Sequence, residues 1–188
     1  MTTERDRQLF QLIEQSGALQ TGHFQLASGF HASRFFRCIK LFRNPHLAQP
    51  LFDAIAQRFA DQPIQYVLGA NEAGSILAFE VAKRLNAEVA IARQKSEHYS
   101  LIPGFHLQPG ETVLIVDDIT TTGGTVKQLI QITESAQAKP IGVGLIATKG
   151  LFQVELNYPT EVLITLENMD AVAPKDCPLC QANIPFTI

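Results

Sequence analysis

Short apolar segments alternate with stretches of helical periodicity along most of the chain, and this alternation limits the fold more than any other feature. The segments expected to form strands are 66–69, 88–92, 112–116, 141–147 and 162–166. Between them, apolar residues recur with the spacing of helices at 44–59, 75–85 and 125–136. Strands that alternate with helices form a parallel sheet, and strands that are apolar throughout are covered on both faces. The sequence therefore predicts an α/β fold with a doubly wound, mainly parallel sheet flanked by helices.

The two ends of the chain do not follow this alternation. Residues 2–16 have the spacing of an amphipathic helix, and residues 21–36 alternate apolar and polar side chains as a β-hairpin does. We predict a single domain over residues 1–188. It is divided into a small N-terminal hood (1–43), an α/β core (44–170) and a C-terminal tail (171–188).

One internal segment, residues 93–110, has little periodicity and contains two Pro-Gly pairs. A long stretch of this kind inside a compact domain is usually a functional loop. We expect such a loop between the strands at 88–92 and 112–116.

The composition excludes several classes of protein. Hydrophobic residues make up 46% of the 188 residues and charged residues 18%, which favours a folded core over disorder. The net charge of −3 is unlike the basic face that nucleic-acid binding requires. No run approaches the roughly 18 apolar residues of a membrane span, and the N-terminus lacks the apolar segment of a signal peptide. We expect a cytoplasmic protein with neither a membrane nor a nucleic acid as partner.

The segment Val113–Thr125 carries the clearest chemical signal. An apolar strand leads into Asp117 and Asp118, which we expect at an exposed turn, and a helix follows. Glycines let backbone N–H groups face a ligand, and a helix N-terminus favours an anion. The residues expected to hold a phosphate are Thr120, Thr121, Thr122, Gly123, Gly124 and Thr125. No lysine follows the glycines, so the segment is not a nucleoside triphosphatase loop. Because carboxylates accept hydrogen bonds from a diol, a ribose 5-phosphate unit satisfies both halves of the motif.

The same segment resembles the motif with which type I phosphoribosyltransferases bind phosphoribosyl pyrophosphate (PRPP). Residues 17–29 are similar to the hood of the orotate phosphoribosyltransferases in that family, and Cys177–Cys180 resembles a tail found in many members. The resemblance implies a type I phosphoribosyltransferase-like fold and an enzyme that transfers ribose 5-phosphate from PRPP to a nitrogenous base, with Mg²⁺ as cofactor. Orotate is the leading base. The alternatives are a PRPP-dependent transferase for a different base and a non-catalytic PRPP-binding regulatory module.

The resemblance also implies roles for individual residues. Asp117 and Asp118 bind the ribose hydroxyls, and Asp118 also stabilises the cationic sugar. Phe35, Phe36 and Thr121 lie beside the base. The remaining catalytic candidates are Arg93 and Lys95, which belong to a loop that closes over the site. The residues implied to bind pyrophosphate are Ala70, Asn71, Glu72, Ala73 and Gly74. Members commonly dimerise so that each loop reaches the partner's site, and a homodimer is expected here.

The sequence departs from the orotate pattern at several positions. Gln94 and Glu97 stand where the family's loop has lysines, and Ala27 stands where its hood has one. Thr148 and Lys149 replace an Asp-Arg pair. Losing one preorganised donor to developing charge typically lowers the rate by about 10²–10³. The base and the competence of the loop therefore stay open at this point. Cationic side chains usually hold a carboxylate such as that of orotate, and the candidates are Arg34, Arg37 and Lys149.

Cys177 and Cys180 form a C-x-x-C pair, which is half of a typical zinc site. No second paired motif completes it, so we interpret the segment as a tail turn shaped by Pro178 and expect no side chain to ligate a metal strongly. The histidines are expected at the surface or in loops rather than as ligands; they are His23, His31, His46, His98 and His106.

Overall fold

The computed structural model describes residues 4–26, 28–150 and 155–187, and its central sheet is of the predicted α/β class. Six strands pair in the order β5-β4-β3-β6-β7-β8. Their bounds are β3 Tyr66–Ala70, β4 Glu88–Lys95, β5 His98–Leu101, β6 Thr112–Thr120, β7 Lys139–Lys149 and β8 Thr160–Leu166. All neighbouring pairs are parallel except β4 and β5, which are antiparallel. The expectation of a mainly parallel sheet is confirmed.

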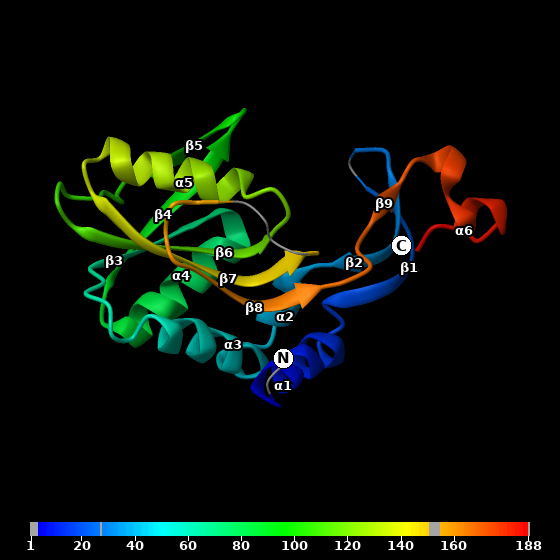
Figure 1. Cartoon of the computed structure of the whole chain (residues 1–188), viewed down its shortest axis with the longest axis horizontal. Helices are drawn as coiled ribbons and strands as arrows, with labels where there is room; N and C mark the ends of the chain where they lie inside the picture. Colours follow the sequence, from blue (N-terminus) through cyan, green and yellow to red (C-terminus); the bar gives the residue numbers. More distant parts are fainter. Residues whose placement is uncertain (1–3, 27, 151–154, 188) are drawn as a thin grey trace.

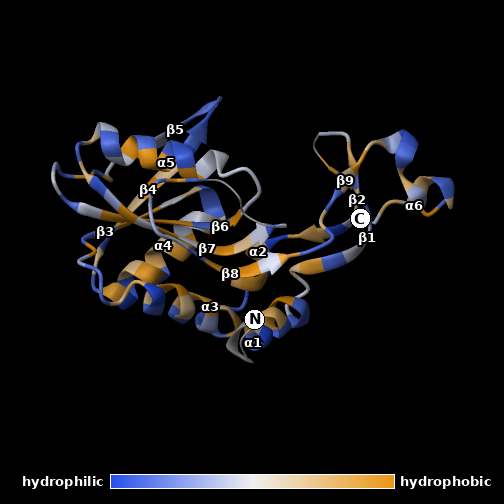
Figure 2. Cartoon of the chain, in the orientation of Figure 1, coloured by the Kyte–Doolittle hydropathy of each residue, from blue (hydrophilic) through white to orange (hydrophobic). Residues whose placement is uncertain are grey.

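Helices cover both faces of this sheet (Figure 1). On one face pack α1 (Glu4–Gln15), α3 (Pro45–Arg58) and α4 (Asn71–Leu85), and on the other packs α5 (Gly124–Ser135). Successive strand residues serve opposite cores: Val67 belongs to the core with α3 and α4, and Leu68 to the core with α5. Both are fully buried, which explains why the strands are apolar throughout. In Figure 2 the helices carry both hydrophilic (blue) and hydrophobic (orange) residues, whereas the central strands are largely hydrophobic.

A second, smaller sheet forms the hood. The predicted hairpin is present as β1 (Leu19–Gln25) and β2 (His31–Phe36). The tail adds the short strand β9 (Ala171–Val172) to the free side of β2, so the order is β1-β2-β9. Two short helical segments follow in the tail, η1 (Pro174–Asp176) and α6 (Pro178–Gln181), and α2 (Cys38–Phe42) connects the hood to the core. Hood and tail thus form one unit beside the main sheet (Figure 1).

The expected loop over residues 93–110 is wrong in its first half. Strand β4 continues to Lys95, and β5 returns antiparallel to it with Lys95 paired with His98. We call this hairpin the β4–β5 arm. Tyr99 and Leu101 pack against the core beneath α5, while His98 and Ser100 are exposed. The alternation spans only four residues, too few to be distinguished from an irregular loop in the sequence.

Two boundaries near the expected turns also differ from the prediction. Strand β6 does not end at Val116 but continues through both aspartates to Thr120, because β7 pairs with it as far as Thr148. Helix α4 begins at Asn71, four residues before the expected start at Ser75. None of the helices within the described ranges is long and apolar enough to cross a membrane.

Candidate active site

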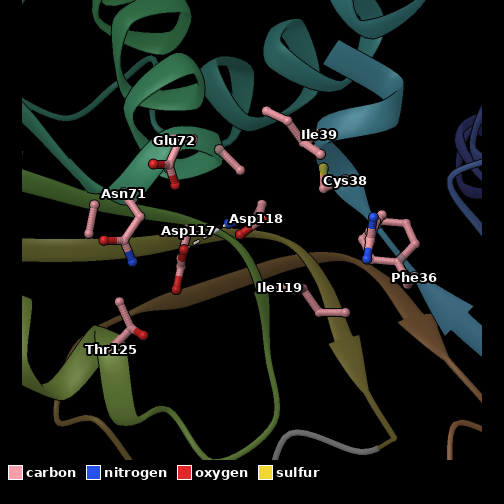
Figure 3. A pocket seen from close by; sticks show the side chains of 13 residues that line it. Phe36, Cys38, Ile39, Asn71, Glu72, Asp117, Asp118, Ile119 and Thr125 are labelled. Atoms are coloured by element: carbon pink, nitrogen blue, oxygen red, sulfur yellow. Dashed lines mark hydrogen bonds between the residues drawn. The ribbon is translucent and has the colours of Figure 1, made fainter. Parts of the chain in front are cut away.

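The principal pocket lies where the strand order reverses. From β3 the chain passes to β4 on one side and later returns to β6 on the other, which leaves a crevice at the carboxyl ends of β3 and β6. A pocket of about 450 Å³ occupies this position. Its walls come from the start of α4, the end of β6 and the segment that joins β2 to α2, and Figure 3 shows their side chains.

Two carboxylates at the end of β6 form the floor of the pocket. Asp117 is 6% exposed, and its Oδ1 accepts a hydrogen bond from the Asp118 N–H at 3.1 Å. Burial, and then the neighbouring charge of Asp118, raises the pKa of Asp117, while burial raises the pKa of Asp118. The expectation that both lie at an exposed turn is wrong, because β6 carries Asp117 into the interior. None of the ion pairs found in the described ranges involves either carboxylate. The pair is therefore held ready for a ligand that supplies hydroxyl groups or positive charge.

The predicted phosphate loop follows directly. The Thr120 hydroxyl, which is buried, accepts a hydrogen bond from the Gly123 N–H at 3.0 Å. Gly123 has φ +71°, in the left-handed region that glycine adopts without strain, and no side chain caps the start of α5. The first N–H groups of α5 are thus left for an anion. Thr125 lines the pocket with the aspartates, whereas Thr121 and Thr122 are exposed beside it. Thr121 is not among the residues that line the pocket, so its assignment to the base stays a prediction.

The second predicted anion-binding segment also reaches the pocket. All five residues from Ala70 to Gly74 line it, and no side chain caps the start of α4. Helix α4 can approach β3 this closely because residue 69 is a glycine. A Cβ atom at this position would collide with the carbonyl oxygen of Gly74. Asn71 has φ +54°, an uncommon value for a residue other than glycine, and such strain is often found at functional sites.

The β4–β5 arm is tied to both anion-binding segments through Tyr99. The Tyr99 hydroxyl accepts a hydrogen bond from Asn71 Nδ2 at 3.0 Å and lies 3.4 Å from the Thr125 hydroxyl. Asn71 Oδ1 in turn accepts from the Gln94 N–H at 3.2 Å. The arm is thereby fixed at the rim of the pocket. The predicted catalytic residues Arg93 and Lys95 are exposed on it, and neither lines the pocket of its own chain.

On the hood side, the structure separates the two predicted base-contacting phenylalanines. Phe36 is buried and lines the pocket. Phe35 points to the opposite face of β2, where it stacks on Phe24 at a centroid distance of 5.5 Å. Adjacent residues of a strand face opposite sides, so only one of the pair can contact a ligand here.

Of the three basic residues that could bind a carboxylate, only one lines the pocket. Arg37 is the only basic residue among the described residues that line the pocket. Arg34 instead donates to the carbonyl of Glu167 at 3.2 Å. Thr148 is buried and donates to the carbonyl of Gly150 at 3.0 Å, and Lys149 does not line the pocket. Ala27 lies outside the described residues.

Three pocket residues carry no functional assignment from the sequence: Cys38, Ile39 and Ile119. Burial, followed by the charges of Asp118 and Asp117, raises the pKa of the Cys38 thiol, so it is neutral in the pocket. For Cys38 and Ile39, the available signal was their position two and three residues after Phe36. Cys38 and Ile39 extend the apolar wall begun by Phe36 (Figure 3).

The fold and the pocket define an α/β protein with a pair of carboxylates, two uncapped helix starts and an apolar wall at the switch point of its sheet. The chain belongs to the phosphoribosyltransferase family: the model of the phosphoribosyl transferase domain matches residues 40–180. This confirms the resemblance found in the sequence.

Individual relatives match over nearly the whole chain. A protein of Desulforamulus reducens named orotate phosphoribosyltransferase is 34% identical over 178 residues, which is 95% of this chain and 93% of the relative. Among solved structures, an orotate phosphoribosyltransferase from Aeropyrum pernix has a TM-score of 0.71 at 21% identity and covers 84% of this chain and 93% of its own. An adenine phosphoribosyltransferase from Rhodothermus marinus has a TM-score of 0.69 at 21% identity, covering 85% of this chain and 99% of its own. The two structures have the same fold as this chain.

Proposed function

We propose that this protein is an orotate phosphoribosyltransferase, which joins orotate to the ribose 5-phosphate of PRPP and releases pyrophosphate. One observation carries the proposal: the paired aspartates, the start of α4 and the Phe36–Arg37 wall meet in one pocket. Its volume of about 450 Å³ is in the range of small-molecule sites. The relatives that match nearly the whole chain are named for the same reaction.

The proposed binding mode assigns each part of PRPP to a separate element. The 5-phosphate lies on the N–H groups and hydroxyls of residues 120–125, the ribose hydroxyls on Asp117 and Asp118, and the pyrophosphate on residues 70–74. These residues bind mainly by hydrogen bonds and helix dipoles, because few cations line the pocket. The binding mode therefore agrees with a chain whose net charge is negative.

The residues do their work mainly by positioning and electrostatics. Positive charge develops on the anomeric carbon as pyrophosphate departs, and Asp118 stabilises it from the end of β6. The apolar wall of Phe36, Cys38 and Ile39 holds the base in place and excludes water from one side of the reacting carbon. Arg37 pairs with the carboxylate of orotate.

The donor set fits the Mg²⁺ that the reaction requires. Magnesium prefers hard oxygen ligands and is usually bound by one or two carboxylates together with substrate phosphates. Asp117 is buried and Asp118 is half-buried; both have raised pKa values, and neither has a cationic partner in the described ranges. They would hold the ion together with PRPP, and the ion supplies positive charge to the departing pyrophosphate.

The position of the β4–β5 arm supports a homodimer. Arg93 and Lys95 are exposed and line no part of their own pocket, so the arm is free to contact a neighbouring site. Helix α4, whose first turn forms part of the pocket, exposes two large apolar side chains on one face, Phe79 at 59% and Ile76 at 38%. A partner that covers these residues would bring the two pockets close together.

We place the enzyme in the cytoplasm.

Two measurements test the proposal. Isothermal calorimetry with Mg²⁺ and PRPP tests the proposed PRPP cradle, which is formed by residues 70–74 and 117–125. Pyrophosphate release is then followed with orotate, uracil, hypoxanthine and adenine. We expect PRPP binding, and release with orotate. Release with another base alone would indicate a transferase of altered specificity, and binding without release on any base would indicate a regulatory module. If PRPP does not bind, the cradle itself is misassigned.

A further inference from the structure

Four potential metal ligands meet between the hood and the tail, outside the pocket. They are His23 of β1, His31 of β2, and Cys177 and Cys180 at the start of α6. One ligand atom from each lies within 4.8 Å of all the others. His23, His31 and Cys177 are buried, and none of the cysteines forms a disulfide. The expectation that His23 and His31 lie at the surface or in loops is wrong.

We propose that this cluster is a structural Zn²⁺ site that ties the C-terminal tail to the hood. Structural zinc is bound by four cysteine or histidine ligands in tetrahedral geometry, and two of each is a common set. The two thiolates would balance the charge of the ion, so the site can be buried without another counter-charge.

Four of the six separations between the ligand atoms are close to those of a tetrahedral zinc site. Bond lengths of about 2.3 Å to sulfur and 2.0–2.1 Å to nitrogen place two nitrogens about 3.3 Å apart, and a nitrogen and a sulfur about 3.6 Å apart. His23 Nε2 lies 3.2 Å from His31 Nδ1, 3.5 Å from Cys177 Sγ and 3.6 Å from Cys180 Sγ. Cys180 Sγ lies 3.2 Å from His31 Nδ1. An ion at the centre of the cluster would need only small shifts of the side chains.

The surroundings of His23 support the same assignment. Its other ring nitrogen, Nδ1, lies 2.7 Å from the carbonyl oxygen of Ile184, which can only accept a hydrogen bond. The proton is therefore on Nδ1, and Nε2 has a free lone pair directed at the cluster. A zinc-bound histidine typically donates its second N–H to a carbonyl or carboxylate in this way. The ring of Phe186 packs against both histidines, with centroid distances of 4.3 Å to His23 and 4.9 Å to His31.

Besides the cluster, only a few short contacts between the described residues hold the tail to the hood. Strand β9 contributes only two residues to the small sheet, and α6 has four. The backbone joins the tail to β1 through Thr187, whose N–H donates to the His23 carbonyl at 2.7 Å. A small unit with a limited core commonly needs a disulfide or a metal to be stable. Zinc would supply that stabilisation here, independently of which base the enzyme uses.

The test uses the full-length chain, purified without chelators and with any histidine tag removed. We expect one zinc per chain by mass spectrometry of the metal. We also expect a Co²⁺-substituted form whose absorption spectrum has the sulfur-to-cobalt charge-transfer band of thiolate ligation. Cys180→Ser should weaken zinc binding by more than the roughly 10–100-fold that loss of an outer-shell partner costs. His46→Asn, at an exposed histidine outside the cluster, should leave it unchanged.

A second measurement applies if Cys180→Ser does not fold. A chelator added to the wild-type chain should lower its Tm, and added Zn²⁺ should restore it. Equal zinc content and affinity in the wild type and the Cys180→Ser variant would overturn the proposal. So would a Tm that does not respond to chelation, or a cobalt form without the charge-transfer band.

Discussion

Replacing Asp117 by asparagine should make the protein more stable while weakening its hold on PRPP. Asparagine has nearly the same shape, and its Oδ1 can still accept the hydrogen bond from the Asp118 N–H. The charge is removed from a side chain that is only 6% exposed and adjoins another carboxylate. Burial and that neighbour raise the pKa of Asp117 in the folded state, so ionising it opposes folding.

The pH dependence follows from the direction of this shift. Below the ordinary aspartate pKa of 3.8, both folded and unfolded chains hold the proton, and Asp117 contributes no penalty. As the pH rises from there toward the raised folded pKa, the unfolded chain loses its proton first, and stability falls. Above the folded pKa the penalty is constant. The Asp117→Asn variant lacks this penalty, so its advantage should be smallest near pH 4 and largest at neutral pH.

The expected gain at neutral pH is about 0.5–2 kcal/mol, typical of removing an unfavourable feature from a functional site. For a domain of this size it corresponds to a Tm higher by roughly 1–8 °C. One charged hydrogen-bond partner of the ribose is lost, which should weaken PRPP binding by about 1.5–3 kcal/mol, or about 10–150-fold. Thermal unfolding between pH 4 and 8 measures the first effect, and calorimetry with Mg²⁺ and PRPP the second.

Two results would refute this reasoning. A stability difference that does not change with pH would show that Asp117 does not titrate as its burial implies. Unchanged PRPP affinity would show that the aspartates do not bind the sugar. The double variant Asp117→Asn with Asp118→Asn extends the test, because it should abolish PRPP use while the chain stays folded by circular dichroism.

Three further substitutions test other parts of the site. Arg37→Ala should raise the KM for orotate by about 10–150-fold without changing the KM for PRPP. The matched variant Arg34→Ala should change neither KM. If the two variants raise the KM for orotate equally, Arg37 is not the carboxylate partner. Glu97→Lys should raise orotate turnover by about 10-fold, or ~1.4 kcal/mol of the barrier, because a negative charge at the tip of the arm is replaced by one that attracts pyrophosphate. No change in steady-state kcat would show that the tip stays away from every active site. Phe79→Glu should convert the dimer into monomers in sedimentation experiments, whereas the control His46→Glu, which adds the same charge elsewhere, should not. If the Phe79→Glu variant is still a dimer, the interface lies elsewhere.

The predicted site residues that the structure brings together as expected are those formed by neighbours in the chain. The carboxylates, the threonines and the glycines of residues 117–125 lie within one strand–loop–helix unit, so their order alone places them together. Within this unit the end of β6 was misplaced, because its last residues are held by pairing with β7, which no local pattern reveals.

The features that the sequence missed depend on contacts between distant segments. Cys180 and His23 are 157 positions apart, and nothing in the C-x-x-C pair identifies which histidines complete it. Tyr99 reaches Asn71 across 28 positions through a hairpin whose alternation is four residues long. The assignment of both Phe35 and Phe36 to the base had a different cause. Successive side chains of a strand point to opposite faces, so the sequence alone already implied that only one of the two phenylalanines could contact the base.

Strand β2 connects the proposed zinc site to the active site. His31 begins the strand and Phe36 ends it, so at about 3.3 Å per residue the ligand and the pocket wall are separated by roughly 17 Å of continuous backbone. β2 pairs with β1 along its length and with β9 at the end that carries His31. A metal that fixes this end against the tail therefore also restricts the direction in which Phe36 and Arg37 approach the pocket. The proposed PRPP cradle is carried by β6, α5 and the start of α4, whereas the proposed wall for the base follows the end of β2. In the proposed arrangement, the α/β core would hold the sugar phosphate and a hood fixed by zinc would position the base.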